Sequence, residues 1–252
     1  MVQHGYLNKK FMRIIARLDI KNNFVIKGIN LEGLRKIGDP ISIANNYYEQ
    51  KIDEIIYIDS VASLYKRNSL PDTIEKTSEN VFVPMTVGGG IRSLGDIELL
   101  LKSGADKVAI NSFGTEEPNF INEAVKNFGS STIVIYVEAK KISEKKWEVY
   151  KYSGREKTGL DLIYWIDKIQ EFECGEILLT SVDYEGMKKG FDIEMVNQIY
   201  DKIKVPLILS GGCGNIEHIK YVKKNFNNVS VALASLLHYK IANIKEIKRE
   251  ID

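Results

Sequence analysis

The sequence predicts a (β/α)8 barrel, in which eight parallel strands alternate with helices around one core. Eight short runs of apolar and β-branched residues recur along the 252 residues. Each run is apolar almost throughout, which indicates strands buried on both faces, as in a parallel sheet covered by helices. Eight such units in about 250 residues match the usual size of this barrel. The chain also contains an internal repeat, which favours the same architecture.

The expected strands follow one another with helical spacing between them. Ile97, Leu100 and Leu101, for example, share one face of a helix. A doubly wound open sheet is the alternative, but no G-x-G-x-x-G motif follows the first strand. We assign residues 1–12 to an N-terminal extension and residues 13–252 to a single barrel domain. The expected strands are residues 13–19, 54–60, 81–87, 107–112, 132–138, 176–182, 205–211 and 229–235.

The internal repeat relates the first four strands to the last four. Pro84 and Pro206 lie 122 positions apart, and so do Glu54 and Glu176. One four-strand half therefore occurs twice, which predicts a two-fold half-barrel repeat. In a closed barrel, equivalent positions of the two halves face each other across the mouth.

Composition and charge exclude several classes of protein. Lysine and arginine (35) nearly balance aspartate and glutamate (34), so no basic surface indicates nucleic-acid binding. Cys174 and Cys213 lack metal-ligand spacing, and His4, His218 and His238 are too scattered for a metal site. No apolar stretch approaches the roughly 18 residues of a membrane span, and the first residues lack the apolar middle of a signal peptide. These features predict a cytoplasmic protein with no metal site and no membrane segment.

Glycine-rich turns follow two of the expected strands at equivalent positions of the repeat. They read VPMTVGGGIRS at residues 83–93 and VPLILSGGCGN at residues 205–215. Glycine at such a turn lets the backbone approach a ligand closely, and exposed N–H groups there bind anions. A tight βα turn is the simpler explanation for either one alone, but two equivalent turns indicate a substrate with a phosphate at each end. The candidate phosphate-binding residues are Gly90, Asn111 and Ser112 in the first half, and Gly212, Ala234 and Ser235 in the second.

Two carboxylates close equivalent strands of the two halves. Asp19 ends the first strand, and Glu138 ends the fifth, 119 positions later. Both are expected to point into the mouth of the barrel, where they can transfer protons to and from a substrate. The alternative is that each caps a loop. The alternating stretch KKWEVYKYSGREKTG after Glu138 predicts a β-hairpin at the same mouth.

Charged residues begin four of the expected strands, with alternating sign. Arg13, Glu54, Lys107 and Glu176 are expected at the amino-terminal face, where they can form a ring of ion pairs around the central opening. A purely structural role is the simpler explanation, because features at this face usually serve stability.

Ordered sequence blocks extend from about Arg13 to the C-terminus: LDIKNNFVIKG, LRKIGDP, DEIIYIDS, TVGGGIRS, GADKVAINS, WEVYKYSGREKTGLD, GEILLTSVDYEGMKKGFD, SGGCG and ALASLLH. In this order they resemble the cyclase subunit of imidazole glycerol phosphate synthase. The phosphoribosyl isomerase of the same pathway is the nearest alternative. VIKG and LLTSVDYEG resemble the cyclase rather than the isomerase.

The resemblance implies a reaction and a partner. A separate glutaminase subunit, a glutamine amidotransferase in a heterodimer, releases ammonia that passes through the barrel. The ammonia attacks a phosphoribulosyl formimino carboxamide ribotide, and this lyase and cyclase reaction gives imidazole glycerol phosphate and an aminoimidazole carboxamide ribotide. No metal or organic cofactor is implied.

The resemblance also implies roles for individual residues. Asp19 matches the essential acid/base of the family, and Lys27 matches a lysine of the mobile loop after the first strand. The four charged residues at the amino-terminal face resemble a gate for ammonia. Further candidate substrate-binding residues are Thr180, Asp183 and Gly186, although the acid of the family pattern next to Asp183 is Glu185 here.

Three side chains depart from the family pattern. Arg17 and Tyr136 stand where the family normally has small residues, and Glu138 replaces the second catalytic aspartate. A misplacement of about 1 Å can cost about 10²-fold in rate, so three larger side chains indicate a reshaped pocket. Two alternatives therefore stay open. One is a paralog that works with an amidotransferase in the amidination of surface sugars, such as nonulosonic acids or O-antigen sugars. The other is a barrel that only activates a glutaminase.

Overall fold

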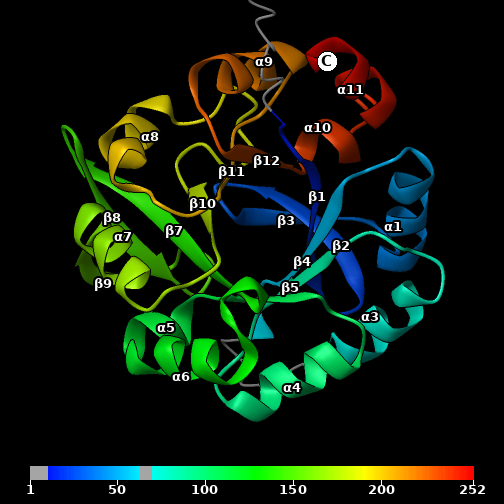
Figure 1. Cartoon of the computed structure of the whole chain (residues 1–252). Coiled ribbons are helices and arrows are strands. Elements are labelled where there is room, and N and C mark those ends of the chain that lie inside the picture. The colour runs from blue at the N-terminus through cyan, green and yellow to red at the C-terminus, as the bar shows by residue number, and fades with distance from the viewer. Residues whose placement is uncertain (1–10, 63–69) are drawn as a thin grey trace, which may run out of the picture.

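The computed structural model describes residues 11–62 and 70–252. Eight parallel strands form a barrel at its centre, and helices surround them (Figure 1). In chain order the barrel strands are β1 (Ile14–Lys21), β4 (Glu54–Asp59), β5 (Met85–Gly88), β6 (Lys107–Ile110), β7 (Ile133–Ser143), β10 (Glu176–Ser181), β11 (Leu207–Ser210) and β12 (Val229–Leu233). β1 pairs with β12 and β7 pairs with β10, so the barrel is closed. The predicted (β/α)8 barrel is confirmed.

Two strands begin later than the sequence pattern predicts, and proline explains both. The apolar runs begin at residues 81 and 205, whereas β5 and β11 begin at Met85 and Leu207, directly after Pro84 and Pro206. Proline has no N–H group and cannot donate to the strand ladder. The carbonyl of each proline still accepts a backbone hydrogen bond of 3.0 Å from the neighbouring strand. These equivalent contacts, 122 positions apart, agree with the half-barrel repeat.

Helices connect the strands on the outside of the barrel, and polar caps define several of their starts. Asp39 accepts a hydrogen bond of 2.8 Å from the backbone N of Ser42, and Ser93 forms a capping box with Asp96. The described helices are α1 (Pro40–Glu49), α3 (Pro71–Ser78), α4 (Leu94–Lys102), α5 (Ser112–Glu116), α6 (Asn119–Phe128), α7 (Leu162–Glu171), α8 (Ile193–Ile199), α9 (Ile216–Asn225), α10 (Ser235–His238) and α11 (Ile244–Ile251).

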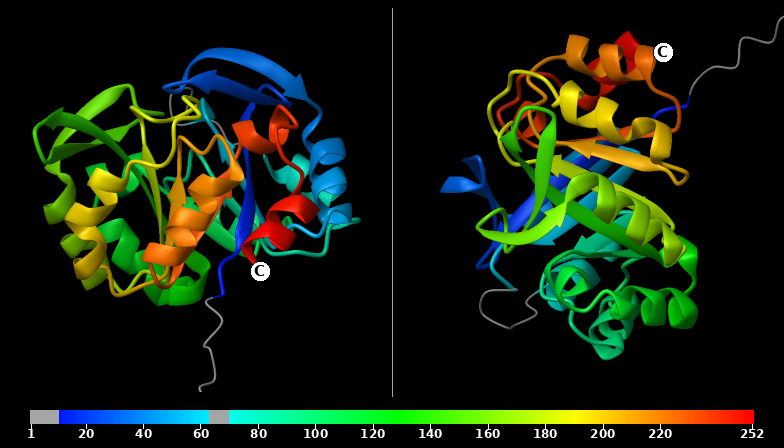
Figure 2. Two further views of the ribbon diagram at one scale, coloured as in Figure 1. Left: turned by 90° about the horizontal axis from the view of Figure 1, so that it is seen from above. Right: turned by 90° about the vertical axis from the view of Figure 1, so that its left-hand side faces the viewer.

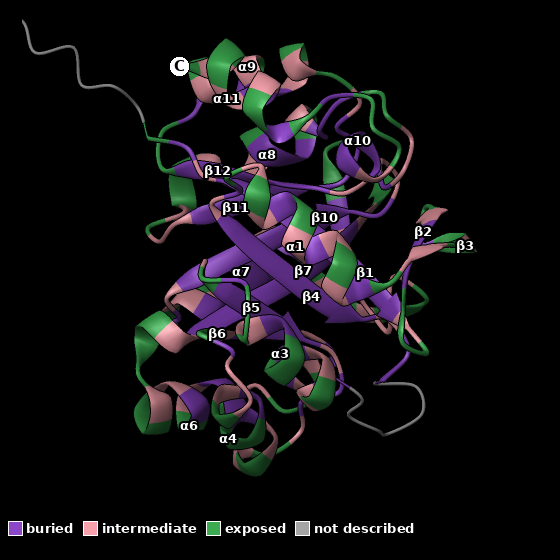
Figure 3. Ribbon diagram, turned by 90° about the vertical axis from the view of Figure 1, so that its right-hand side faces the viewer, coloured by how far each residue is buried: buried purple, intermediate pink, exposed green. Residues whose placement is uncertain are grey.

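Apolar side chains fill the space on both sides of the barrel wall. Ile15, Ile56, Val134, Leu178 and Ile208 form a cluster inside the barrel. A larger cluster lies between the strands and the helices. Figure 3 shows the barrel strands as buried and the outer helix faces as exposed. The barrel interior is therefore a packed core, which fixes the positions of the carboxyl ends of the strands.

Two β-hairpins extend from the carboxyl-terminal end of the barrel, where the mouth lies (Figure 2). β2 (Phe24–Ile29) and β3 (Glu32–Gly38) follow β1, while β8 (Lys146–Lys151) and β9 (Glu156–Asp161) follow β7. The second hairpin agrees with the alternating pattern of the sequence. The two hairpins meet, because a Cβ atom placed on Gly154 would lie 3.2 Å from Cδ1 of Leu31.

Three further sequence expectations concern the N-terminal extension, membrane segments and metal sites. Residues 1–10 of the expected extension lie outside the described residues, and Met12 is buried against the core. Within residues 11–62 and 70–252, no helix is long and apolar enough to cross a membrane. The same residues contain no group of three or more His, Cys, Asp or Glu side chains that could hold a metal ion.

Candidate active site

Asp19 lies near the carboxyl end of β1 and is 4% exposed. Its Oδ1 accepts a hydrogen bond of 2.9 Å from Nε of Arg17, and its Oδ2 lies 3.9 Å from Nζ of Lys27. β2 runs back antiparallel to β1 and pairs Ile26 with Asp19, which brings Lys27 beside the carboxylate. Asp19 therefore lies between two cations at the mouth.

Lys27 is buried between two acidic side chains. Its ammonium group faces Asp19 and forms an ion pair with Glu185, which follows β10. Burial lowers the pKa of Lys27 to about 8; Asp19 opposes this shift and Arg17 adds to it. Lys27 can therefore gain or lose a proton at mildly alkaline pH.

Glu138 lies on β7, four strands around the barrel from β1 and therefore opposite Asp19. It is 1% exposed. Its Oε1 accepts a hydrogen bond of 2.7 Å from the hydroxyl of Tyr136, and its Oε2 accepts one of 3.0 Å from the backbone N of Gly154. Burial raises the pKa of Glu138, although the Tyr136 hydrogen bond and the charge of Arg17 oppose the shift. Glu138 thus has neutral donors where Asp19 has cations.

The first cradle lies at the carboxyl ends of β5 and β6. It consists of Gly90, Asn111 and Ser112, which line a cavity of about 250 Å³. The turn requires glycine, because Gly89 has a φ of 105° and a Cβ atom there would lie 2.5 Å from the carbonyl oxygen of Asp59. Oδ1 of Asn111 is buried and has no hydrogen-bond partner within the described part of the chain. Such an atom needs a partner, and a ligand can supply it.

The second cradle lies at the carboxyl ends of β11 and β12. It consists of Gly186, Gly212, Ala234 and Ser235, which line a cavity of about 10 Å³. Gly212 has a φ of 96°, and a Cβ atom there would overlap the carbonyl oxygen of Gly190. Oγ of Ser235 is buried without a hydrogen-bond partner among the described residues. Glu185 lines the same cavity, and its Oε2 would lie 3.1 Å from a Cβ atom placed on Gly211.

The structure does not bring two of the candidate substrate-binding residues to either cradle. Thr180 is fully buried inside the barrel, where its hydroxyl accepts a hydrogen bond of 2.8 Å from Nη1 of Arg17. Asp183 accepts one of 2.8 Å from the backbone N of Lys141. Both residues therefore have hydrogen-bond partners within the protein, and their role in substrate binding stays a prediction.

Arg17 and Tyr136 belong to a hydrogen-bonded network that the sequence did not reveal. Nη2 of Arg17 donates to the hydroxyl of Tyr136 at 2.8 Å, and Tyr136 donates to Glu138. The size of these side chains indicated a reshaped pocket, but their connection did not follow from the sequence. The partners of Arg17 on other strands lie 119 to 193 positions away along the chain, so no local pattern identifies them. The ion pair of Lys27 with Glu185 spans 158 positions and was missed for the same reason.

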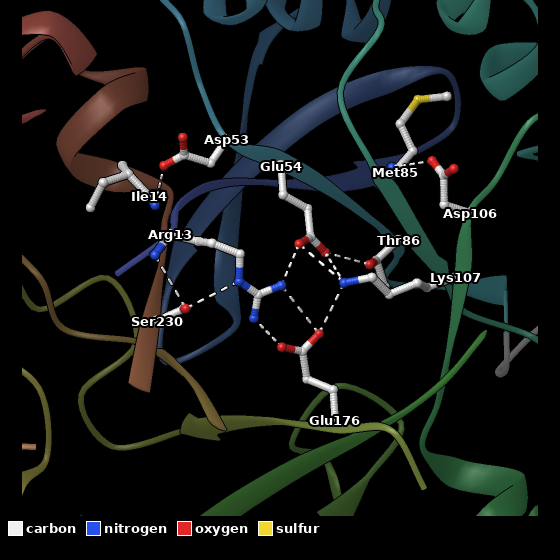
Figure 4. A network of polar contacts seen from close by, with 10 residues as sticks. All are labelled: Arg13, Ile14, Asp53, Glu54, Met85, Thr86, Asp106, Lys107, Glu176 and Ser230. Atoms are coloured by element: carbon white, nitrogen blue, oxygen red, sulfur yellow. Dashed lines mark hydrogen bonds and ion pairs between the residues drawn. The ribbon is translucent and has the colours of Figure 1, made fainter. Parts of the chain in front are cut away.

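The four charged residues at the other end of the barrel form a closed ring of ion pairs (Figure 4). We call Arg13, Glu54, Lys107 and Glu176 the charged ring. Arg13 pairs with Glu54 at 2.7 Å and with Glu176. Lys107 pairs with both glutamates at 3.0 Å. Because Arg13 precedes β1 and Asp19 lies near its end, the ring and the carboxylates are at opposite ends of the barrel.

The fold and the site together define a class of protein, the (β/α)8 barrels that bind phosphorylated ligands at the carboxyl ends of their strands. A model of one family, described as histidine biosynthesis protein, matches residues 13–243. The chain belongs to this family and is a HisF-like member of it.

Relatives from several bacteria carry the name imidazole glycerol phosphate synthase subunit HisF. The one from Legionella pneumophila is 52% identical over 206 residues, which are 82% of this chain and 97% of the relative. The one from Bacillus cereus (strain Q1) is 44% identical over 239 residues, 95% of each chain. The one from Lactococcus lactis subsp. lactis (strain IL1403) is 44% identical over 240 residues, 95% of this chain and 93% of the relative. The resemblance to the cyclase subunit is confirmed, and these names do not favour the sugar-amidination or activator alternatives.

Proposed function

We propose that this chain is the ammonia-dependent cyclase subunit of an imidazole glycerol phosphate synthase and that it works in the cytoplasm. Its substrate is a phosphoribulosyl formimino carboxamide ribotide, which carries a phosphate at each end. Its products are imidazole glycerol phosphate and an aminoimidazole carboxamide ribotide. One observation carries the proposal: Asp19 and Glu138 face each other from opposite strands at the mouth where both cradles lie.

Each cradle holds one phosphate of the substrate. Backbone N–H groups at the glycine turns and the hydroxyl groups of Ser112 and Ser235 are the donors that a phosphate requires. Oγ of Ser235 gains a phosphate oxygen as its missing partner, while the orphan Oδ1 of Asn111 accepts from a substrate hydroxyl. A phosphate in the second cradle repels the carboxylate of Glu185, which lines it. Displacement of Glu185 releases Lys27 toward the substrate.

The two carboxyl groups supply the proton transfers of the reaction. Attack by ammonia releases a proton, and cleavage of the ribotide requires one at the departing nitrogen. Asp19 is the candidate acceptor, because its carboxylate lies at the mouth beside Lys27. Glu138 is suited to hold and deliver one, because burial raises its pKa. The two hairpins exclude water from both groups, which are 4% and 1% exposed.

A glutaminase subunit supplies the ammonia in this proposal. The charged ring surrounds the central opening at the end of the barrel opposite the cradles, and a docked glutaminase delivers ammonia there. Arg13 and Lys107 are 22% and 18% exposed, so the ring is reachable from that face. The partner and the chain form a heterodimer.

Turnover by the purified chain with the ribotide and ammonium chloride tests the proposal, with the two products measured by liquid chromatography and mass spectrometry. Asp19→Asn is expected to lower the rate by at least about 10²-fold, because it removes an acid/base group. Asp167→Asn, at an exposed position on α7, is the matched control and keeps the wild-type rate. The wild-type gene should also restore growth of a histidine auxotroph that lacks its cyclase at high ammonium. An inactive wild-type chain, or a fully active Asp19→Asn variant, contradicts the proposal.

A further inference from the structure

Arg17 is a fully buried cation inside the barrel, with 1% of its surface exposed. Its guanidinium donates hydrogen bonds of 2.8 to 3.0 Å to side chains on four strands: Asp19 on β1, Tyr136 on β7, Thr180 on β10 and Ser210 on β11. A buried charge is costly unless it is paired and hydrogen-bonded. These contacts meet both conditions and hold the guanidinium in one position.

Arg17 connects the two candidate acid/base groups across the barrel. Its Nε donates to Asp19 at 2.9 Å, and its Nη2 donates to the hydroxyl of Tyr136 at 2.8 Å. Tyr136 in turn donates to Glu138 at 2.7 Å. The guanidinium carbon also lies 5.1 Å from the centre of the Tyr136 ring. An unbroken chain of hydrogen bonds therefore runs from one carboxyl group to the other.

Other charged groups approach the Asp19 end of this chain. Lys27 lies 3.9 Å from Asp19 and is itself paired with Glu185. Nε2 of His238 lies 3.1 Å from the backbone oxygen of Arg17, on the outer side of β1. Arg155, from the turn between β8 and β9, lines a small cavity together with Asp19. Asp19 thus keeps one close cation, Lys27, if Arg17 is removed.

The Glu138 end has a different set of neighbours. Asp59, Glu116 and Arg92 line the cavity of the first cradle with Glu138, and Tyr150 pairs with it from β8. The side chain of Asn111, in the first cradle, also donates a hydrogen bond to Glu138, as do the Tyr136 hydroxyl and the backbone N of Gly154. Arg17 is the cation that is hydrogen-bonded to Tyr136 and, through it, connected to Glu138.

We propose that Arg17 is a positioning residue for the cyclase reaction: it fixes the carboxylate of Asp19 and, through Tyr136, the carboxyl group of Glu138. This inference rests on the proposed function of the same site. Arg17 lines neither cradle nor the small cavity beside Lys27, so it does not touch the phosphates of a substrate. Its removal is expected to affect the chemical step and not the binding of the ribotide.

Two substitutions in the full chain test this role. Arg17→Met removes the cation with little change in length, and Tyr136→Phe removes only the hydroxyl link. The protonation midpoint of Glu138 is measured by carboxyl ¹³C NMR, and turnover of the ribotide with ammonium chloride is measured against pH. The control is Arg249→Met, because the Arg249 side chain is 76% exposed on α11.

Both variants are expected to change the protonation midpoint of Glu138 and the turnover rate together. Loss of the cation raises the midpoint of Glu138, and loss of the hydroxyl donor shifts it in the same direction. In both variants the kcat falls by about 10²-fold and the pH profile moves with Glu138. The KM for the ribotide stays unchanged in Arg17→Met, because Arg17 lines neither cradle. Arg17→Lys restores the charge, and hence the midpoint, but only part of the kcat, because lysine lacks the planar fork of donors.

The outcomes separate this inference from the proposed function. A wild-type midpoint of Glu138 in both Arg17→Met and Tyr136→Phe overturns the positioning role, as does a change confined to KM. If Arg17→Met does not fold, Tyr136→Phe decides, since it keeps the aromatic ring in place. A wild-type chain without turnover refutes the proposed function, and the NMR titration of the unliganded protein then decides the role of Arg17.

Discussion

Gly212→Ala is expected to damage the second cradle much more than a glycine substitution elsewhere. Gly212 has a φ of 96°, and the new Cβ atom would overlap the carbonyl oxygen of Gly190. The backbone N of Gly190 donates to the carbonyl of Gly212 at 2.8 Å, so moving the two segments apart breaks this hydrogen bond. The substitution therefore combines backbone strain, overlap and a lost hydrogen bond.

These effects can be estimated separately. A side chain at positive φ costs roughly 1–2 kcal/mol. Overlap in a packed region adds about 1–3 kcal/mol, and the lost hydrogen bond adds about 1 kcal/mol. The sum is about 4 kcal/mol, which lowers the melting temperature of a chain of this size by about 12 °C.

Gly129→Ala is the matched control. Gly129 has a φ of 84°, but a Cβ atom there meets nothing within 4 Å. Because its ψ of 150° lies in a region that is essentially restricted to glycine, this variant is expected to lose only the strain, about 1–3 kcal/mol or about 6 °C. Calorimetry and urea unfolding measure the difference in stability between the two variants. Titration with inorganic phosphate measures the affinity of the second cradle. Similar melting temperatures for the two variants would refute the close approach that we assign to Gly212.

Three further predictions concern other parts of the chain. The pKa of Lys27 is lowered to about 8, so its charge is present below that pH and lost above it; kcat/KM should fall as pH rises through this value, and Lys27→Arg, which stays charged, should remove that fall. Glu54→Gln removes the charge that pairs with Arg13 at 2.7 Å and Lys107 at 3.0 Å. It should lower the free energy of unfolding by about 2 kcal/mol, between the values for exposed and buried pairs, and an unchanged urea midpoint would argue against a cohesive ring. Burial raises the pKa of Cys174 and Cys213 to about 12, so neither thiol should react with a disulfide reagent at pH 8 until the chain unfolds, and rapid labelling of the native protein would contradict this.

The barrel could be predicted from the sequence because its signals are local and repeated. Strands buried on both faces have continuous apolar runs, and these runs identify every barrel strand. Pro84 and Pro206 revealed the internal repeat, because they occupy equivalent positions in the two halves, where each carbonyl accepts the same backbone hydrogen bond. The turns after these strands then placed Gly90 and Gly212 at the mouth.

The parts that could not be predicted depend on contacts between distant segments. The β2–β3 turn places Asn30 and Leu31 at φ values of 49° and 64°, and leucine gives no signal for such a turn. The sequence placed Thr180 near the end of a strand, but its hydrogen bond to Arg17 inside the barrel joins residues 163 positions apart. The sequence identified Arg17 as too large for its place, whereas its bonds to four strands follow only from closure of the barrel.

A crystal structure of the chain with the bisphosphorylated ribotide bound tests the central claim most directly. One phosphate is expected at Gly90 and Ser112, the other at Gly212 and Ser235, and the atoms between them should pass between Asp19 and Glu138. A ligand that places both phosphates in one cradle, or that binds at the charged ring, would contradict the proposed site.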